Sequence, residues 1–284
     1  MDISFDIDRF MEGSGRVDLS DIVWEDVPKH RLTPEALRTV KYFHQTESFT
    51  FYYLKGLMAT RAAQQEPEFA PFLCAWAYEE EFHGRAFLKF MEAYGESVRD
   101  DYRGLAFSDR TIGERIDEAG QTALSMIFPD VWPATHMVWG AIQELTTYHA
   151  YRQLMDRTGH PVLKVICERI MKQELKHFAF YYQQARKRFS DSKLAQHIAR
   201  GALTLAWTPV GDGMSSKDDV SHALSFLFDG NDGDGVKKIE QRIQTLPGME
   251  WFDLFSRYVE KNRIGKAPEA WLDQPGALEA SAAE

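Results

Sequence analysis

The sequence predicts an all-α protein whose core is a four-helix bundle, and two observations carry this prediction. Four stretches of about 25 residues place apolar side chains at spacings of three and four, the period of one helix face. These stretches also carry a pattern of Glu followed by Glu-x-x-His, used twice: Glu47, Glu80 with His83, Glu144, and Glu174 with His177. Two helical hairpins with similar polar residues on their inner faces are therefore expected.

The chain is expected to begin with an irregular arm over residues 1–32, which show no sustained period. The first long helix is predicted to start after Thr33, a capping residue followed by Pro34 at the first helical position, and to run to about Arg61. Its apolar stripe consists of Val40, Phe43, Glu47, Phe51 and Leu54. A carboxylate inside an apolar stripe is costly unless it is paired or bound to a metal, so Glu47 is a candidate ligand.

The second helix is predicted over residues 70–94, with Gly95 placed to end it. Its stripe contains Phe72 or Leu73, then Trp76, Glu80, His83, Phe87 and Phe90. Three residues of helix rotate by about 300°, so Glu80 and His83 share one face and can hold one metal ion together. Residues 96–132 are expected to form a polar connection that contains a helix near 110–127.

The third helix is predicted over residues 134–158 and the fourth over residues 162–189. The inner face of the third contains Met137, Gly140, Ala141, Glu144, Thr147, Tyr148 and Tyr151. The inner face of the fourth contains Leu163, Cys167, Ile170, Glu174, His177 and Tyr181. Gly140 and Ala141 leave volume one turn before Glu144, which suits close helix packing, the commoner reason, or a substrate.

Shorter helices are expected after the bundle, near residues 192–206, 216–228, 235–245 and 249–262. The DGNDGDG segment at 229–235 indicates a turn, because its acids and glycine are out of register with a calcium loop. The predicted organisation has four parts: an N-terminal arm (1–32), the four-helix bundle (33–190), additional helices packed on it (191–264) and a flexible tail (265–284).

The composition, with 44% hydrophobic and 27% charged residues, is that of a soluble globular protein. Neither a secretory signal nor a membrane span is predicted, and the two cysteines do not form a paired framework, so a reducing cytoplasm is the expected compartment. The formal net charge of -10 argues against nucleic-acid binding. Residues 151–200 nevertheless carry 11 Lys and Arg against four acids. This basic segment is either a solvated helix face or a landing site for an acidic partner.

The four Glu and two His suit a pair of Fe(II) ions. Four carboxylates balance the four positive charges of two Fe(II), and the imidazoles bind as neutral ligands, so the buried site is close to electroneutral. Mixed imidazole and carboxylate ligands suit iron or manganese better than a soft-ligand metal, and by themselves they do not exclude zinc. The alternative is that these are surface or salt-bridged side chains that happen to be well spaced.

The segment from Trp76 to Gly84 resembles the W-x-x-E-E-x-x-H-G motif of the soluble acyl-acyl-carrier-protein (acyl-ACP) desaturases, a family within the ferritin-like superfamily. Three further segments resemble its remaining ligand sites: Thr46-Glu47, Gln143-Glu144-Leu145-Thr146-Thr147, and Glu174-Leu175-Lys176-His177. The resemblance covers roughly residues 33–190 and implies a ferritin-like di-iron bundle. It also implies that Thr147 helps proton delivery and that Trp76 lies near the iron. The alternatives are a hydroxyl bonded to its own helix and a core aromatic.

The resemblance implies an enzyme, an O₂-dependent oxidoreductase of fatty acid biosynthesis that removes two hydrogens from the acyl chain of acyl-ACP, with two iron ions as cofactor. No nucleotide-binding glycine motif or iron–sulfur cysteine set is visible, so an external electron donor such as a ferredoxin is implied. The basic segment suits an acidic carrier protein, and a homodimer is expected from the family alone. Gln173 departs from the plant members, which have an acid there that is linked with electron entry.

Two rival functions remain open. A di-iron hydroxylase or amine N-oxygenase keeps the metals and changes the reaction, although N-oxygenases of this superfamily tend to carry an extra His where this chain has Ile170. Iron storage or sequestration needs no organic substrate, although storage ferritins are shorter and generally lack the second complete Glu-x-x-His. The acyl length and the position of the new double bond do not follow from the sequence.

Overall fold

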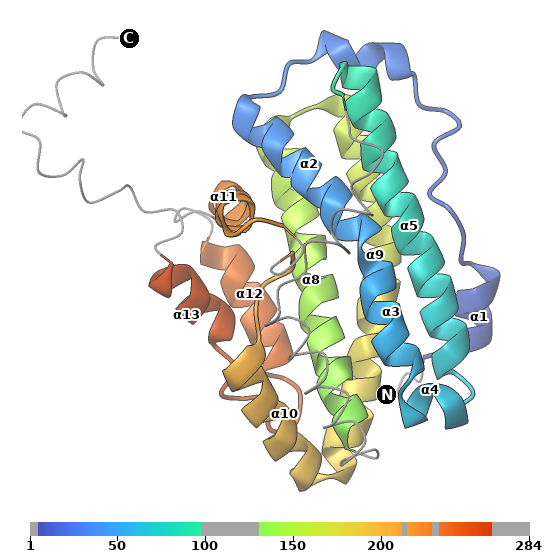
Figure 1. The fold of residues 1–284 in the computed structure, drawn as a ribbon, viewed down its shortest axis with the longest axis vertical. Helices are drawn as coiled ribbons and strands as arrows, with labels where there is room; N and C mark the ends of the chain where they lie inside the picture. Colours follow the sequence, from blue (N-terminus) through green and yellow to red (C-terminus); the bar gives the residue numbers. More distant parts are fainter. Residues whose placement is uncertain (1–4, 98–130, 212–214, 229–232, 263–284) are drawn as a thin grey trace, which may run out of the picture.

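The computed structural model describes residues 5–97, 131–211, 215–228 and 233–262. The elements of these ranges are all helices, which confirms the all-α prediction (Figure 1). None of these helices combines the length and the apolar character that crossing a membrane requires. The expected helix near 110–127, residues 229–232 of the expected turn at 229–235 and the tail from 265 lie outside the described residues. Residues 233–235 do not form a turn, because they begin the helix Gly233–Ile243.

The core of the molecule consists of two helical hairpins. Helix α2 (Pro34–Ser48), continued by α3 (Thr50–Met58), packs against α5 (Phe69–Tyr94), and α8 (Trp132–Thr158) packs against α9 (Pro161–Asp191) (Figure 1). The predicted helix cap at Thr33 and helix end at Gly95 are both observed. The hydroxyl of Thr33 accepts a hydrogen bond from the Ala36 N–H at the start of α2. Gly95 ends α5 with a left-handed φ of 93°.

The prediction of one continuous first helix is wrong, because the helix breaks at Phe49. The Phe49 N–H donates to the carbonyl of Thr46, three residues back, so the chain turns more tightly here than in an α-helix. The hydroxyl of Thr50 donates to the carbonyl of Glu47 beside the break. The changed register turns Phe51, which was expected in the buried stripe, outward, and 47% of it is exposed.

Close approaches at glycines hold the hairpins together. A Cβ at Gly84 of α5 would lie 2.4 Å from the Ser48 hydroxyl of α2, and a Cβ at Gly140 of α8 would lie 2.5 Å from the Tyr181 ring of α9. The space that Gly140 leaves is therefore filled by an aromatic ring from the neighbouring helix. Of the two uses considered for that volume, helix packing is the one observed.

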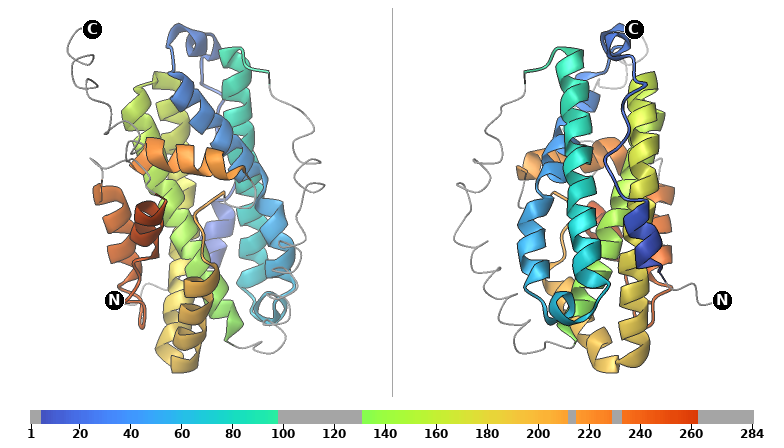
Figure 2. Two further views of the ribbon diagram at one scale, coloured as in Figure 1. Left: turned by 60° about the vertical axis from the view of Figure 1, so that its left-hand side comes forward. Right: turned by 90° about the vertical axis from the view of Figure 1, so that its right-hand side faces the viewer.

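The smaller helices surround the bundle. Two short ones lie in the N-terminal arm, which runs along α5 and α9 (Figure 2). On the opposite flank α10 and α12 pack against α8, α11 packs against α2, and α13 packs against α12. Their bounds are α1 Ile7–Glu12, η1 Trp24–Lys29, α4 Arg61–Gln65, α10 Lys193–Ala206, α11 Lys217–Phe228, α12 Gly233–Ile243 and α13 Leu254–Lys261. The four-part division of the chain stays a prediction.

Candidate metal centre

The six predicted ligands meet inside the bundle. Helix α2 supplies Glu47, α5 supplies Glu80 and His83, α8 supplies Glu144, and α9 supplies Glu174 and His177. Each of them is at most 6% exposed. Their donor atoms form two groups, and in each group all donor atoms lie within 4.8 Å of one another. The first group consists of Glu47, Glu80, His83 and Glu174. The second consists of Glu80, Glu144, Glu174 and His177. The structure thus brings together every residue that the sequence suggested as a ligand.

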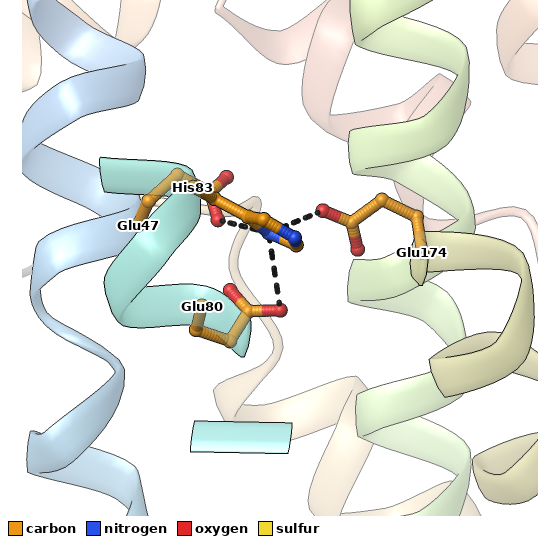
Figure 3. A group of neighbouring side chains, drawn as sticks. All are labelled: Glu47, Glu80, His83 and Glu174. Carbon is orange, nitrogen blue, oxygen red and sulfur yellow. Dashed lines mark ion pairs between the residues drawn. The ribbon is translucent and has the colours of Figure 1, made fainter. Parts of the chain in front are cut away.

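In the first group, one nitrogen of His83 faces three carboxylates (Figure 3). Its Nδ1 lies 3.5 Å from Glu47 Oε2, 3.7 Å from Glu80 Oε1 and 3.3 Å from Glu174 Oε1. The three acids come from three different helices, α2, α5 and α9. The donors therefore converge on one point from several directions, as ligands around a cation do.

The second group repeats this arrangement around His177. Its Nδ1 lies 3.2 Å from Glu80 Oε1, 3.5 Å from Glu144 Oε2 and 3.6 Å from Glu174 Oε2. Glu80 turns the same oxygen toward both imidazoles, whereas Glu174 turns one oxygen toward each. Glu80 and Glu174 are consequently the two residues placed to bridge a pair of metals.

The donor atoms are spaced as ligands of one metal ion are, and several of them lack a hydrogen-bond partner. Atoms bound to one ion at about 2.1 Å lie roughly 3 to 3.5 Å apart, close to the separations found here. The buried atoms without a hydrogen-bond partner in the described part of the chain include Glu80 Oε1, both oxygens of Glu174 and the Nδ1 atoms of His83 and His177. Buried polar atoms are rarely left unbonded, so these fit metal coordination.

The pKa shifts within the cluster also indicate that cations would stabilise it. Burial raises the pKa of Glu144 to about 8, and burial with the neighbouring carboxylates raises the pKa of Glu80 well above its ordinary value. Burial opposes charge on His83 and His177, yet the facing carboxylates raise the pKa of both well above the ordinary range. Four acids this close cannot all be ionised without positive charge among them, which bound metal ions would supply.

The far nitrogen of each imidazole is held by a residue that the ligand pattern does not contain. His177 Nε2 lies 2.7 Å from Glu79 Oε2, and His83 Nε2 lies 2.9 Å from Gln173 Oε1. Because both partners accept, each Nε2 carries the proton and each Nδ1 keeps its lone pair for a metal. The sequence reasoning missed Glu79, although it directly precedes a ligand, and noted Gln173 only as a departure from a family.

The carboxylate ligands also receive hydrogen bonds from side chains around them. Tyr151 donates to Glu47 Oε1 at 2.5 Å, and Trp76 Nε1 donates to Glu144 Oε1 at 3.0 Å. Trp76 therefore touches a candidate ligand as well as the core. Thr147 is buried on α8, three residues after Glu144, and its proposed part in proton delivery stays a prediction.

Aromatic rings close the site from the side of the N-terminal arm. The rings of Phe10 and Phe72 lie with their centroids 6.3 Å and 6.4 Å from that of His177. Phe72 is stacked on Phe180 at 3.6 Å, and both are fully buried. Such a shell keeps bulk water away from the acids and strengthens the electrostatic interactions among them.

A comparison with known protein families gives one result that bears on this site. The model of a family described as fatty acid desaturase matches residues 43–199, more than half of the chain. The matched range contains all six candidate ligands and the residues that hold them from outside, apart from those of the N-terminal arm. Searches of curated proteins and of solved structures gave no match.

Proposed function

The chain belongs to the fatty acid desaturase family, and from this we propose that it is a di-iron, O₂-dependent desaturase acting on a fatty acyl chain carried by acyl carrier protein. The single observation that carries the metal part of the proposal is the sharing of Glu80 and Glu174 between two four-residue donor sets. A single ion has no use for shared carboxylates, whereas two ions held close together can be bridged by them. The soluble acyl-ACP desaturases within the ferritin-like superfamily have this ligand pattern.

The iron pair would supply the redox chemistry: O₂ and two external electrons, with two protons, remove two hydrogens from adjacent acyl carbons and leave water. The chain's own side chains have simpler tasks. Glu80 and Glu174 would hold both ions, and Glu47 and Glu144 would each complete one position. Manganese fits the same donors, since hard oxygen and imidazole ligands do not separate it from iron.

An acidic carrier protein would find a basic surface on α9. Five exposed cations of this helix fall on one side at 100° per residue: Lys164, Lys172, Lys176, Arg186 and Lys187. One exposed acid, Glu168, lies among them, 3.9 Å from Lys164. Arg188 also belongs to the basic segment, but it bonds Glu66 at 2.6 Å and its side chain is only 12% exposed. The proposed carrier site therefore consists of the five, without Arg188. A ferredoxin-like donor and a homodimer remain proposals that rest on the resemblance alone.

The first test is metal content. Purified protein loaded anaerobically with Fe(II) should hold about two irons per chain, and Glu174→Ala should hold fewer because it removes a ligand of both positions. Glu81→Ala is the matched control, because Glu81 pairs with Arg85 at 2.8 Å on the same helix as Glu80 and belongs to neither donor set. Iron retained in full by Glu174→Ala would contradict the proposed site.

The second test identifies the reaction. The iron-loaded protein, given O₂, an electron source and acyl-ACP, should yield a product lighter by two hydrogens in the mass spectrum. Gain of one oxygen would instead assign a hydroxylase, and oxygen consumption with iron turnover but no acyl product would favour iron storage. Running acyl-coenzyme A beside acyl-ACP shows whether the carrier is recognised or only the acyl chain.

A further inference from the structure

The two candidate imidazoles are joined by a hydrogen-bonded chain on the outer side of the centre. His177 Nε2 lies 2.7 Å from Glu79 Oε2, Gln173 Nε2 donates to Glu79 Oε1 at 2.8 Å, and Gln173 Oε1 lies 2.9 Å from His83 Nε2. Glu79 is completely buried, and Gln173 is partly buried. His177 is therefore bonded to a carboxylate, and His83 to a neutral amide.

The backbone of Gly15, in the N-terminal arm, contacts both side chains that hold the imidazoles. The Gly15 N–H donates to Glu79 Oε1 at 3.0 Å, and the Gly15 carbonyl accepts from Gln173 Nε2 at 2.7 Å. The backbone N–H of Gly15 faces position 79, which suits an acid there, because a carboxylate accepts hydrogen bonds. The backbone carbonyl of Gly15 faces position 173, which suits an amide there, because an amide NH₂ group donates. The same contacts fix the orientation of the Gln173 amide, because its NH₂ group meets two acceptors.

The other contacts of the ligands are balanced between the two positions. Glu80 and Glu174 are shared. Each terminal acid receives one donor, Glu47 from Tyr151 and Glu144 from Trp76. The partners of the imidazoles are thus the clearest difference between the two halves of the centre.

We propose that the Gly15, Glu79 and Gln173 unit makes the two metal positions unequal, so that a divalent metal fills the His177 position before the His83 position. A carboxylate that accepts the imidazole N–H raises the basicity of the metal-binding nitrogen more than an amide does, and it adds a negative charge close to the ion. Residues that act in this way typically change metal affinity by about 10- to 100-fold. The inference rests on the proposed di-metal function and adds an order of filling to it.

The test isolates the positions with two variants of the full chain. Glu47→Ala removes the terminal acid of the His83 position, and Glu144→Ala removes that of the His177 position. Mn(II) is the probe, because electron paramagnetic resonance counts the free ion directly and the measurement needs no turnover. The Glu47→Ala protein should bind its first Mn(II) about 10-fold more tightly than the Glu144→Ala protein. Equal affinities, or the opposite order, would overturn the inference.

The role of Glu79 is tested in the same two backgrounds. Adding Glu79→Gln should weaken Mn(II) binding about 10-fold or more at the His177 position, and by less at the His83 position. Glu81→Gln is the matched control: it removes the same charge two residues further along α5, from a side chain that pairs with Arg85. An equal loss from Glu81→Gln would mean that net charge alone governs affinity, and the inference would fail.

A variant in the arm tests the unit without touching either side chain. Gly15→Pro removes the N–H that Glu79 accepts, and it should weaken binding at the His177 position several-fold. Gly15→Ala keeps this N–H, and a Cβ there meets no atom within 4 Å, so it controls for the change of residue. Unchanged affinity in a folded Gly15→Pro protein would remove the arm from the unit. Absence of Mn(II) binding even to the unmodified chain would instead refute the di-metal function itself.

Discussion

Trp76 and Tyr151 each donate one hydrogen bond to a terminal carboxylate of the centre, and these bonds orient the oxygens that face the metals. Trp76→Phe keeps most of the buried ring and removes the indole N–H. Glu144 then loses its donor inside the protein, so we expect metal affinity at the His177 position to fall by about 10-fold or more while the fold is retained. Calorimetric titration with Mn(II), beside a circular dichroism spectrum, measures both effects.

Trp132→Phe is the matched control for that substitution. Trp132 is also buried at 4% exposure, but its Nε1 has no hydrogen-bond partner among the described residues. The Trp132→Phe substitution should therefore leave metal binding unchanged. Equal losses in the two variants would show that Trp76 contributes packing alone, which is the core-aromatic reading of this residue.

His160 links the start of α9 to the N-terminal arm and makes this link sensitive to pH. Its Nδ1 accepts from the Leu163 N–H at 3.3 Å, and its Nε2 lies 3.1 Å from the Val27 carbonyl, so the ring must be neutral to make both bonds. The rings of His30 and Phe90 also face it, at centroid distances of 5.5 Å and 4.9 Å. Burial lowers the pKa of His160, and the neighbouring His30 lowers it further.

The sign of the pH effect follows from this lowered pKa. The unfolded chain binds a proton at His160 below its ordinary pKa of about 6.5, whereas the folded chain resists protonation, so stability is complete above that pH and falls as the pH drops toward the folded pKa. His160→Asn can still cap the helix and does not titrate. Melting temperatures measured from pH 7.5 to 5 should therefore fall less in the variant. Parallel curves would count against His160 as the titrating group.

At the scale of helices, the crossing of α8 and α9 depends on the missing side chain of Gly140. A Cβ there would lie 2.5 Å from the Tyr181 ring, which is 1% exposed and cannot move outward. Gly140→Ala should therefore destabilise the protein by about 1–3 kcal/mol, although alanine favours helix. In Gly201→Ala of α10 no atom lies within 4 Å of the new Cβ, so this control should gain about 0.5–1 kcal/mol. Urea denaturation distinguishes the two signs, and a stabilised Gly140→Ala would show that the helices can separate at no cost.

At the scale of the whole molecule, charge is distributed unevenly on an acidic chain. The net charge is -10, yet the outer side of α9 is basic, and it lies on the helix that supplies Glu174 and His177. Arg186→Ala with Lys187→Ala should weaken binding of acyl-ACP several-fold at low salt and reduce the dependence of affinity on salt, because complementary charge acts mainly on encounter.

Lys217→Ala with Lys237→Ala is the control for that double variant. It removes the same charge from exposed residues of α11 and α12, which are not part of the proposed carrier site. Its affinity for acyl-ACP should stay close to that of the unmodified chain when measured by fluorescence anisotropy. Equal losses in both double variants would indicate a general effect of net charge and no defined carrier site.

The sequence by itself determined the features that depend on neighbours within one or two helical turns. The helix period, the cap at Thr33, the end at Gly95 and the one-face spacing of Glu80 and His83 are local, so residue types and intervals were enough to predict them. The pairing of two similar hairpins followed from the repeated order of Glu and Glu-x-x-His.

Only the tertiary structure decided which residues support those ligands. Gly15 and Gln173 are 158 positions apart, and Glu79 and His177 are 98 apart, so no local pattern relates them. The break at Phe49 and the outward turn of Phe51 also escaped prediction, because a hydroxyl bond and a close approach between helices outweigh an unbroken apolar stripe. A ligand is recognisable by its place on a helix face. A residue that orients a ligand is defined by what folding brings against it.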